Sequence, residues 1–212
     1  MSKQPATIIF DFDGTIAQTL HLLLYLPEEL LRLTAVKEIT HAEIDYLKRH
    51  GILKFLQLLR VSPLRLPKMI TELQRLFARH IHNIPLVEGI TDALESLHNR
   101  PAQIGIITSN TRQNVEAYLE FHQLNMVSFV YADRSILGKH RVISRALKER
   151  RIDPDTTLYI GDEVRDVEAA RKSGIRSVAV TWGFSHREAL EQAKPDWIFD
   201  TPAELLIEIS EA

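Results

Sequence analysis

Thr7-Ile8-Ile9-Phe10 leads directly into Asp11-Phe12-Asp13-Gly14-Thr15, and this stretch near the start of the chain decides the fold. Its first four residues are apolar or β-branched, which is typical of a buried strand. Residues i and i+2 of a strand point to the same side, so the carboxylates of Asp11 and Asp13 can face one site at the strand tip. A surface Asp-Gly turn is the alternative interpretation of this segment taken alone.

Outward from this strand, short apolar runs alternate with amphipathic helical stretches. The alternation predicts an α/β fold, Rossmann-like, with a mainly parallel sheet and helices on both faces. The expected strands are Thr7–Phe10, Ile104–Thr108, Phe129–Tyr131, Thr157–Ile160, Ser177–Val180 and Trp197–Phe199. The expected helices lie near Gly89–Asn99, Arg112–His122, Lys139–Arg150, Val164–Ser173 and Pro202–Ser210.

The stretch from about Ala17 to Pro85 breaks this alternation, because it contains helix-like segments and no convincing strand. We expect helices over Thr19–Leu33 and Glu43–Arg49, the second opened by a capping box of Thr40 and Glu43. A last long helix ends near His82, with an apolar stripe that favours packing: Leu66, Ile70, Leu73 and Phe77.

This pattern predicts two units in the chain. Residues 1–16 and 86–212 form an α/β core, and residues 17–85 form an inserted all-helical cap domain. Because the insertion directly follows the first strand, it lies over the carboxyl end of that strand. In open α/β sheets, ligands bind at that end.

Composition narrows the classes of function. The 212 residues are 45% hydrophobic and 25% charged, as in ordinary globular proteins, which excludes the disordered and fibrous classes. The 26 basic and 28 acidic residues give a formal net charge of −2, so charge does not favour a nucleic acid or an anionic membrane as partner. The absence of cysteine excludes disulfides, thiolate nucleophiles and Cys-ligated metals.

The sequence also predicts a compartment. The longest stretch without a charged residue, Gly14 to Pro27, is shorter than the roughly 20 apolar residues of a membrane-spanning helix. Met1 to Phe10 lacks the long apolar region of a secretory signal. We therefore expect a cytoplasmic protein.

Polar residues also follow other expected strands. Thr108-Ser109-Asn110 precedes a helix, so hydroxyls and free backbone N–H groups gather there and form an anion site. Gly161-Asp162-Glu163 ends another strand, with Asp166 at the start of the next helix, and Gly138-Lys139 opens a further one. Each segment alone is an ordinary cap or solvated surface, but together they predict one site at the carboxyl edge of the sheet.

This set of groups suits phosphate chemistry. An aspartate can attack phosphorus and form an aspartyl phosphate, while a neighbouring acid protonates the leaving oxygen and later activates water. Carboxylates are hard oxygen ligands, and an octahedral Mg²⁺ site that keeps several waters has these candidates: Asp11, Asp13, Asp162 and Asp166. Lys139 adds a compact positive charge that can act on phosphate.

The segment Ile9-Phe10-Asp11-Phe12-Asp13-Gly14-Thr15, together with Gly161 to Asp166, resembles the motifs of the haloacid dehalogenase superfamily. From Ile8 to about Leu206 the chain is similar to the phosphoglycolate phosphatase-like group, which has a helical cap after the first motif. True haloacid dehalogenases lack the second aspartate, so Asp13 favours phosphoryl transfer. The usual Asp-Ser after the motif is replaced here by Gln18-Thr19, a departure at the cap hinge that concerns the substrate.

The resemblance implies catalytic roles for three residues. Asp11 is expected to be the nucleophile and a metal ligand. Asp13 is expected to be the general acid and base, and to bind the metal through its backbone carbonyl. Lys139 matches the lysine that steadies the nucleophile and the transferring phosphoryl group.

The resemblance also implies the residues that bind phosphate and metal. Thr108 is the expected phosphate-binding hydroxyl, with Ser109 and Asn110 adding backbone donors. Asp162 is expected to ligate Mg²⁺ directly, and Asp166 directly or through water.

We expect the cap to select the substrate. Arg49 and His50 are the first candidates for substrate contact, because the adjacent Gly51 suits a tight turn directed at the site. Further candidates are other polar residues of the same segment: Gln18, His21 and Lys54.

The leading hypothesis is a Mg²⁺-dependent phosphatase that hydrolyses a small phosphorylated metabolite, a phosphoglycolate-like phosphomonoester, through an aspartyl-phosphate intermediate. One alternative is a phosphomutase or phosphotransferase, which passes the phosphoryl group to another hydroxyl instead of water. Another is a non-catalytic binding module on this fold. The expected partner is the small phosphorylated metabolite, with no nucleic acid and no membrane, and no protein partner is indicated.

Overall fold

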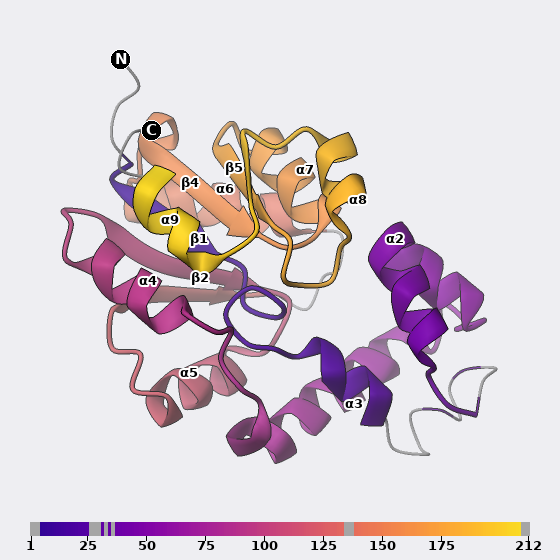
Figure 1. Ribbon diagram of the computed structural model, residues 1–212. Helices are drawn as coiled ribbons and strands as arrows, with labels where there is room; N and C mark the ends of the chain where they lie inside the picture. Colours follow the sequence, from indigo (N-terminus) through magenta and orange to yellow (C-terminus); the bar gives the residue numbers. More distant parts are fainter. Residues whose placement is uncertain (1–4, 26–30, 32–33, 35–36, 134–137, 209–212) are drawn as a thin grey trace.

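A single parallel sheet organises the computed structural model, which describes residues 5–25, 31, 34, 37–133 and 138–208 (Figure 1). Within these residues the sheet has six strands in the order β3-β2-β1-β4-β5-β6, all paired in parallel. The strands are β1 (Thr7–Phe10), β2 (Gln103–Thr108), β3 (Val127–Ala132), β4 (Thr157–Gly161), β5 (Arg176–Val180) and β6 (Trp197–Phe199). Each strand expected from the sequence is present.

Strand β1 lies in the middle of the sheet, between β2 and β4. All four of its residues are buried. Ile8 and Phe10 point into one hydrophobic cluster and Ile9 into another, because side chains alternate between the two faces of a strand. A strand covered on both faces reads as a continuous apolar run, which explains the pattern of its sequence.

Helices cover both faces of the sheet. On the Ile8 face, α4 contacts β2 and α9, and α5 contacts β3, while on the Ile9 face α6 contacts β2 and α7 contacts β4 and β5. The helices of this body are α4 (Ile90–His98), α5 (Arg112–Phe121), α6 (Lys139–Arg150), α7 (Val164–Lys172), α8 (Arg187–Ala193) and α9 (Pro202–Glu208), with the 3-10 turn η3 (Pro154–Thr156). This is the α/β fold that the alternation of strands and helices predicts.

The described part of the segment between β1 and α4 is helical. Its elements are η1 (Leu20–Tyr25), α2 (His41–Leu58), α3 (Leu66–His80) and η2 (Ile81–Asn83). Many of their apolar residues form a separate cluster that includes Leu47, Phe55 and Met69, while Phe77 and Ile81 belong to the core of the α/β body. Figure 1 shows α2 and α3 beyond the edge of the sheet to which the strands point.

The two ends of this helical segment lie together. The backbone N–H of Gln18 donates to Pro85, and that of Val87 donates to Ile16. A bridge between Ala17 and Leu86 joins the two passages of the chain. The segment therefore leaves and re-enters the α/β body at one place, while the division at residues 16/17 and 85/86 stays a prediction.

Local details differ from the sequence-based expectations. The Thr40–Glu43 capping box is confirmed, but α2 continues beyond Arg49 through a kink at Gly51, to Leu58. Helix α8 was not expected. Leu20–Tyr25 is a 3-10 helix, and most of the rest of the expected Thr19–Leu33 helix lies outside the described residues.

The chain has no described helix that combines the length and the apolarity needed to cross a membrane.

Candidate active site

The loop after β1 holds the Asp11 carboxylate with its own backbone. Phe12 donates its backbone N–H to Asp11 Oδ1 at 2.8 Å, and the backbone N–H of Gly14 donates to Ala17. Gly14 has a φ of +83°, and a Cβ there would lie 2.3 Å from Asp162 Oδ2. Only glycine fits this close approach, so the Asp-Gly pair is a part of the site and not a surface turn.

Lys139 connects two of the expected site residues. Its Nζ lies 2.7 Å from Asp11 Oδ2 and also pairs with Asp166 Oδ1, and all three side chains are buried. Burial alone would lower the pKa of Lys139, but Asp11 and Asp166 outweigh it and raise that pKa. The lysine at the start of α6 is therefore a charged group that fixes the position of the Asp11 carboxylate.

Asp162 and Asp166 are held by neighbouring donors. Thr15 Oγ1 donates to Asp162 Oδ1 and the backbone N–H of Phe184 donates to Asp162 Oδ2, both at 2.7 Å. The backbone N–H of Glu163 donates to Asp166 Oδ2 at 3.0 Å and so closes a capping box at the start of α7. These bonds direct both carboxylates toward Asp11.

Three carboxylates meet in a buried cluster. One oxygen each of Asp11, Asp162 and Asp166 lies within 4.8 Å of the others. Burial raises the pKa of Asp11 to about 7, although Lys139 lowers it. Burial and then the charge of Asp11 raise the pKa of Asp162 well above its ordinary value. Lys139 alone does not balance the charge of three carboxylates, because Arg165 nearby is paired with Glu163. The carboxylate oxygens fit a hard divalent cation.

The Asp13 side chain lies outside this cluster, against the loop that follows β2. Asn110 Nδ2 is 3.3 Å from both oxygens of Asp13, and the backbone N–H of Asn110 donates to Thr108 Oγ1 at 2.9 Å. Burial raises the pKa of Asp13 to about 6, with the side chains of Asn110 and Thr19 opposing it. The structure thus brings the expected acid beside the expected phosphate-binding loop.

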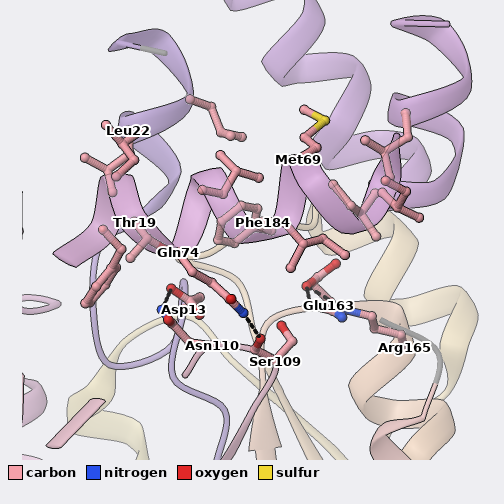
Figure 2. Close-up of a pocket in the computed structure, with 18 residues that line it drawn as sticks. Asp13, Thr19, Leu22, Met69, Gln74, Ser109, Asn110, Glu163, Arg165 and Phe184 are labelled. Carbon is pink, nitrogen blue, oxygen red and sulfur yellow. Dashed lines mark hydrogen bonds and ion pairs between the residues drawn. The ribbon is translucent and has the colours of Figure 1, made fainter. Parts of the chain in front are cut away.

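A cavity of about 180 Å³ lies between this loop and the helical segment (Figure 2). Its lining includes Asp13 and Ser109 from the α/β body and Gln74 from α3. Apolar residues of η1, α3 and the loop after β5 supply most of its walls, among them Leu22, Met69, Leu73 and Phe184. Asp13 lines the cavity, whereas the three carboxylates of the cluster are not among its lining residues in the described structure.

The expected substrate-contacting residues lie elsewhere. Arg49 is an exposed residue of α2 that pairs with Asp45 at 2.7 Å, and the His50 ring packs against the Tyr46 ring. Neither residue is among those that line the cavity in the described structure. Gln18 and Lys54 are also exposed, and the side chain of His21 lies outside the described residues. Substrate contact by Arg49 and His50 stays a prediction.

Three polar residues that line the cavity were not among the site residues expected from the sequence: Gln74, Glu163 and Arg165. Arg165 donates its Nε–H to Glu163 Oε1 at 2.8 Å, between the two expected metal ligands of the same segment. Gln74 occupies a helical position that matches the apolar stripe of α3, four residues after Ile70. A polar residue inside an apolar stripe is the signal that marks it.

Comparison with protein families gives one decisive result: the family model described as haloacid dehalogenase-like hydrolase matches residues 8–180. The chain belongs to the haloacid dehalogenase-like hydrolases. The matched range includes both motif segments of the resemblance and every residue of the carboxylate cluster.

Individual relatives of this hydrolase agree with the family. A phosphoglycolate phosphatase of Synechococcus elongatus is 35% identical over 94% of both chains. A pyrophosphatase PpaX of Bacillus mycoides is 27% identical over 94% of both chains. The crystal structure of a predicted phosphatase from Clostridium acetobutylicum has a TM-score of 0.83 at 21% identity, over 99% of this chain and 100% of that one, and shows the same fold. The expectation of an enzyme, a phosphoric monoester hydrolase, is confirmed.

Proposed function

We propose that the chain is a Mg²⁺-dependent phosphatase that hydrolyses a small phosphorylated metabolite through an aspartyl-phosphate intermediate. The observation that carries this proposal is the position of Asp11. Its carboxylate pairs with Lys139 at 2.7 Å and lies within 4.8 Å of two further buried acids, while Asp13 lies two residues along the chain.

The reaction has two steps. In the first, a carboxylate oxygen of Asp11 forms a bond to phosphorus as the bond to the leaving oxygen breaks, and Asp13 gives that oxygen a proton. In the second, Asp13 takes a proton from water, which attacks phosphorus and releases Asp11 and inorganic phosphate. Lys139 keeps Asp11 in place, and the backbone donors of the Thr108–Asn110 loop hold the phosphoryl oxygens.

Asp11, Asp162 and Asp166 would hold the metal with their side chains, and Asp13 with its backbone carbonyl. Mg²⁺ suits this oxygen donor set, and when bound it neutralises the charge that develops on the phosphoryl group. In this proposal residues 17–85 act as a cap that excludes bulk water from the site. The apolar walls of the cavity between α3 and the loops support this role.

Phosphoglycolate is the first substrate to test, because the Synechococcus relative carries that name. Inorganic pyrophosphate is the second, after the Bacillus relative. No nucleic acid, membrane or protein partner is part of the proposal. The compartment that we propose is the cytoplasm, in line with the absence of cysteine.

The test is hydrolysis of an aryl phosphate by the wild type, Asp11→Asn and Asp92→Asn, each with Mg²⁺ and with a chelator. Asp92 is an exposed residue of α4, so it controls for the Asp-to-Asn change itself. We expect activity in the wild type and Asp92→Asn with Mg²⁺ only, and none in Asp11→Asn. Undiminished turnover in Asp11→Asn contradicts the nucleophile assignment, and turnover in the chelator contradicts the metal dependence.

The same assay separates hydrolysis from transfer. We expect one inorganic phosphate for each aryl alcohol released. A phosphomutase or phosphotransferase gives less inorganic phosphate than alcohol when a second alcohol is added, since that alcohol takes the phosphoryl group.

A further inference from the structure

Gln74 extends from α3 toward the Ser109 loop and lies near Asp13 (Figure 2). Its side-chain Nε2 donates to the carbonyl oxygen of Ser109 at 3.0 Å. Its backbone carbonyl accepts from Asn114 Nδ2 at 2.8 Å. With 8% of its surface exposed, Gln74 is a buried residue that connects the helical segment to the phosphate-binding loop.

The oxygen of the Gln74 side-chain amide accepts no hydrogen bond in the described structure. Gln74 Oε1 is buried and has no hydrogen-bond partner among the residues that the structure describes. The orientation of the amide is fixed, because the carbonyl of Ser109 can only accept, and so Nε2 must face it. An acceptor buried without a donor is costly, and native proteins retain few of them.

Gln74 and Asp13 line the same cavity. Asp13 is the residue that gives a proton to the leaving oxygen, so the part of the substrate next to it is the leaving group. A volume of about 180 Å³ is far more than the ~10–15 Å³ that one water needs, and it holds several non-hydrogen atoms. Leu22, Met69 and Leu73 make the walls apolar, which disfavours an unpaired charge there.

We propose that Gln74 selects the substrate by accepting a hydrogen bond at Oε1 from an uncharged leaving group that carries a hydroxyl or N–H donor. This inference rests on the proposed phosphatase activity and narrows its substrates to phosphate esters of short hydroxyalkyl compounds. A carboxylate at the same position has no proton to donate and repels Oε1. The positive charge of Arg165, which also lines the cavity, is paired with Glu163.

Three matched phosphate esters test this assignment in the wild-type enzyme with Mg²⁺. The leaving group of 2-hydroxyethyl phosphate ends in a hydroxyl. The leaving group of propyl phosphate ends in a methyl group of similar size. The leaving group of phosphoglycolate ends in a carboxylate. We expect kcat/KM for the hydroxyethyl ester to exceed both others by about tenfold, the usual effect of one hydrogen bond to a buried group.

A variant separates substrate contact from positioning of the Ser109 loop. Gln74→Met keeps the length of the side chain and removes Oε1, while Gln57→Met makes the same change at an exposed position of α2. In Gln74→Met we expect the ratio of hydroxyethyl to propyl ester to fall from about ten to about one. Gln57→Met keeps the wild-type ratio, and circular dichroism checks that both variants fold.

Equal rates with the hydroxyethyl and propyl esters in the wild type overturn the proposal, as does phosphoglycolate as the best of the three. If Gln74→Met lowers the activity toward every ester by the same factor, Gln74 only positions the Ser109 loop. That result also overturns the proposal. These outcomes leave the phosphatase itself intact. Failure to hydrolyse any ester, the aryl phosphate included, overturns the proposed function and this inference together.

Discussion

Asp13 combines two properties that an acid and base catalyst needs. It is half-buried next to the proposed phosphate-binding loop, and desolvation raises the pKa of its carboxyl to about 6. A general acid and base works best when its pKa lies near the working pH. Both protonation states of Asp13 are therefore populated near neutral pH, as the two steps of the proposed reaction require.

This pKa predicts different pH profiles for two kinds of ester. As the pH rises through about 6, the protonated fraction of Asp13 falls, and an alkyl phosphate needs that proton for its alkoxide. A nitrophenyl phosphate has a leaving group that is stable without a proton, whereas ionisation of the nucleophile Asp11 affects both esters alike. The ratio of kcat/KM for the alkyl ester to kcat/KM for the nitrophenyl ester should therefore fall toward tenfold per pH unit. The measurement is both profiles, each corrected for the ionisation of the ester itself. Parallel profiles contradict the role of Asp13 as acid.

Among single residues, those at strand ends could be predicted and those from the helical segment could not. Asp11 and Asp162 follow adjacent parallel strands, and strand polarity alone brings such ends to one edge. Gln74 reaches the site from helix α3. The local pattern of residues does not encode how this helix packs against the α/β body. A polar residue in an apolar stripe is a signal that the sequence carries, but only the folded chain brings Gln74 to the Ser109 loop.

Helix α2 contains a backbone conformation that is nearly restricted to glycine. Gly51 interrupts the helix with φ 78° and ψ 169°, and a Cβ at this position would have no atom within 4 Å. A larger residue at position 51 would therefore not clash with neighbouring atoms. Its cost would come only from the strained φ and ψ angles of the backbone. The kink separates the first part of α2 from the part that carries Ile52 and Leu56 to the cavity wall.

The sign of a Gly51→Ala substitution tests this geometry. In a regular helix, alanine in place of glycine raises the free energy of unfolding by roughly 0.5–1 kcal/mol. At the Gly51 kink we expect a decrease of about 1–3 kcal/mol, because alanine is strained in this conformation. Equilibrium denaturation measures the difference, with Gln57→Ala in the same helix as the control. A more stable Gly51→Ala variant means that α2 is straight in solution.

Helices and strands with a clear pattern of apolar residues could be predicted from the sequence. An element that depends on tertiary contacts with other elements could not. The strands β1 and β6 have the bounds that the apolar runs indicated. Strand β1 is buried on both faces of the sheet, which accounts for its run of apolar and β-branched residues. Helix α8 has only seven residues and one buried side chain, Leu190, so its pattern is too short to recognise. It packs on α7, and this tertiary contact accounts for its presence.

At the scale of the whole molecule, the carboxylate cluster joins separate parts of the sheet. Asp11 follows β1, Asp162 follows β4, and Asp166 lies in the first turn of α7. A cation held by all three links elements that are far apart in the chain. Since the unfolded chain does not bring these residues together, such a cation binds the folded state and stabilises it.

Metal binding is thus expected to raise the stability of the whole protein. At a free Mg²⁺ concentration one hundred times the dissociation constant, the free energy of unfolding rises by about 2.7 kcal/mol. Thermal or denaturant unfolding with and without Mg²⁺ measures the change. Asp162→Asn should lose most of it, because Asp162 is a buried member of the cluster, whereas Asp92→Asn should keep it. An equal rise in both variants places the metal elsewhere.

The central position of β1 also determines when the sheet can form during synthesis. Thr7 pairs with Gln103 on one side and with Thr157 on the other, so β1 is made long before either partner strand. Pairings between such distant residues form slowly, and an apolar segment without partners tends to associate with other chains meanwhile. Asp11 is therefore synthesised before the other residues of the site, yet it acquires its surroundings only after β4 has left the ribosome.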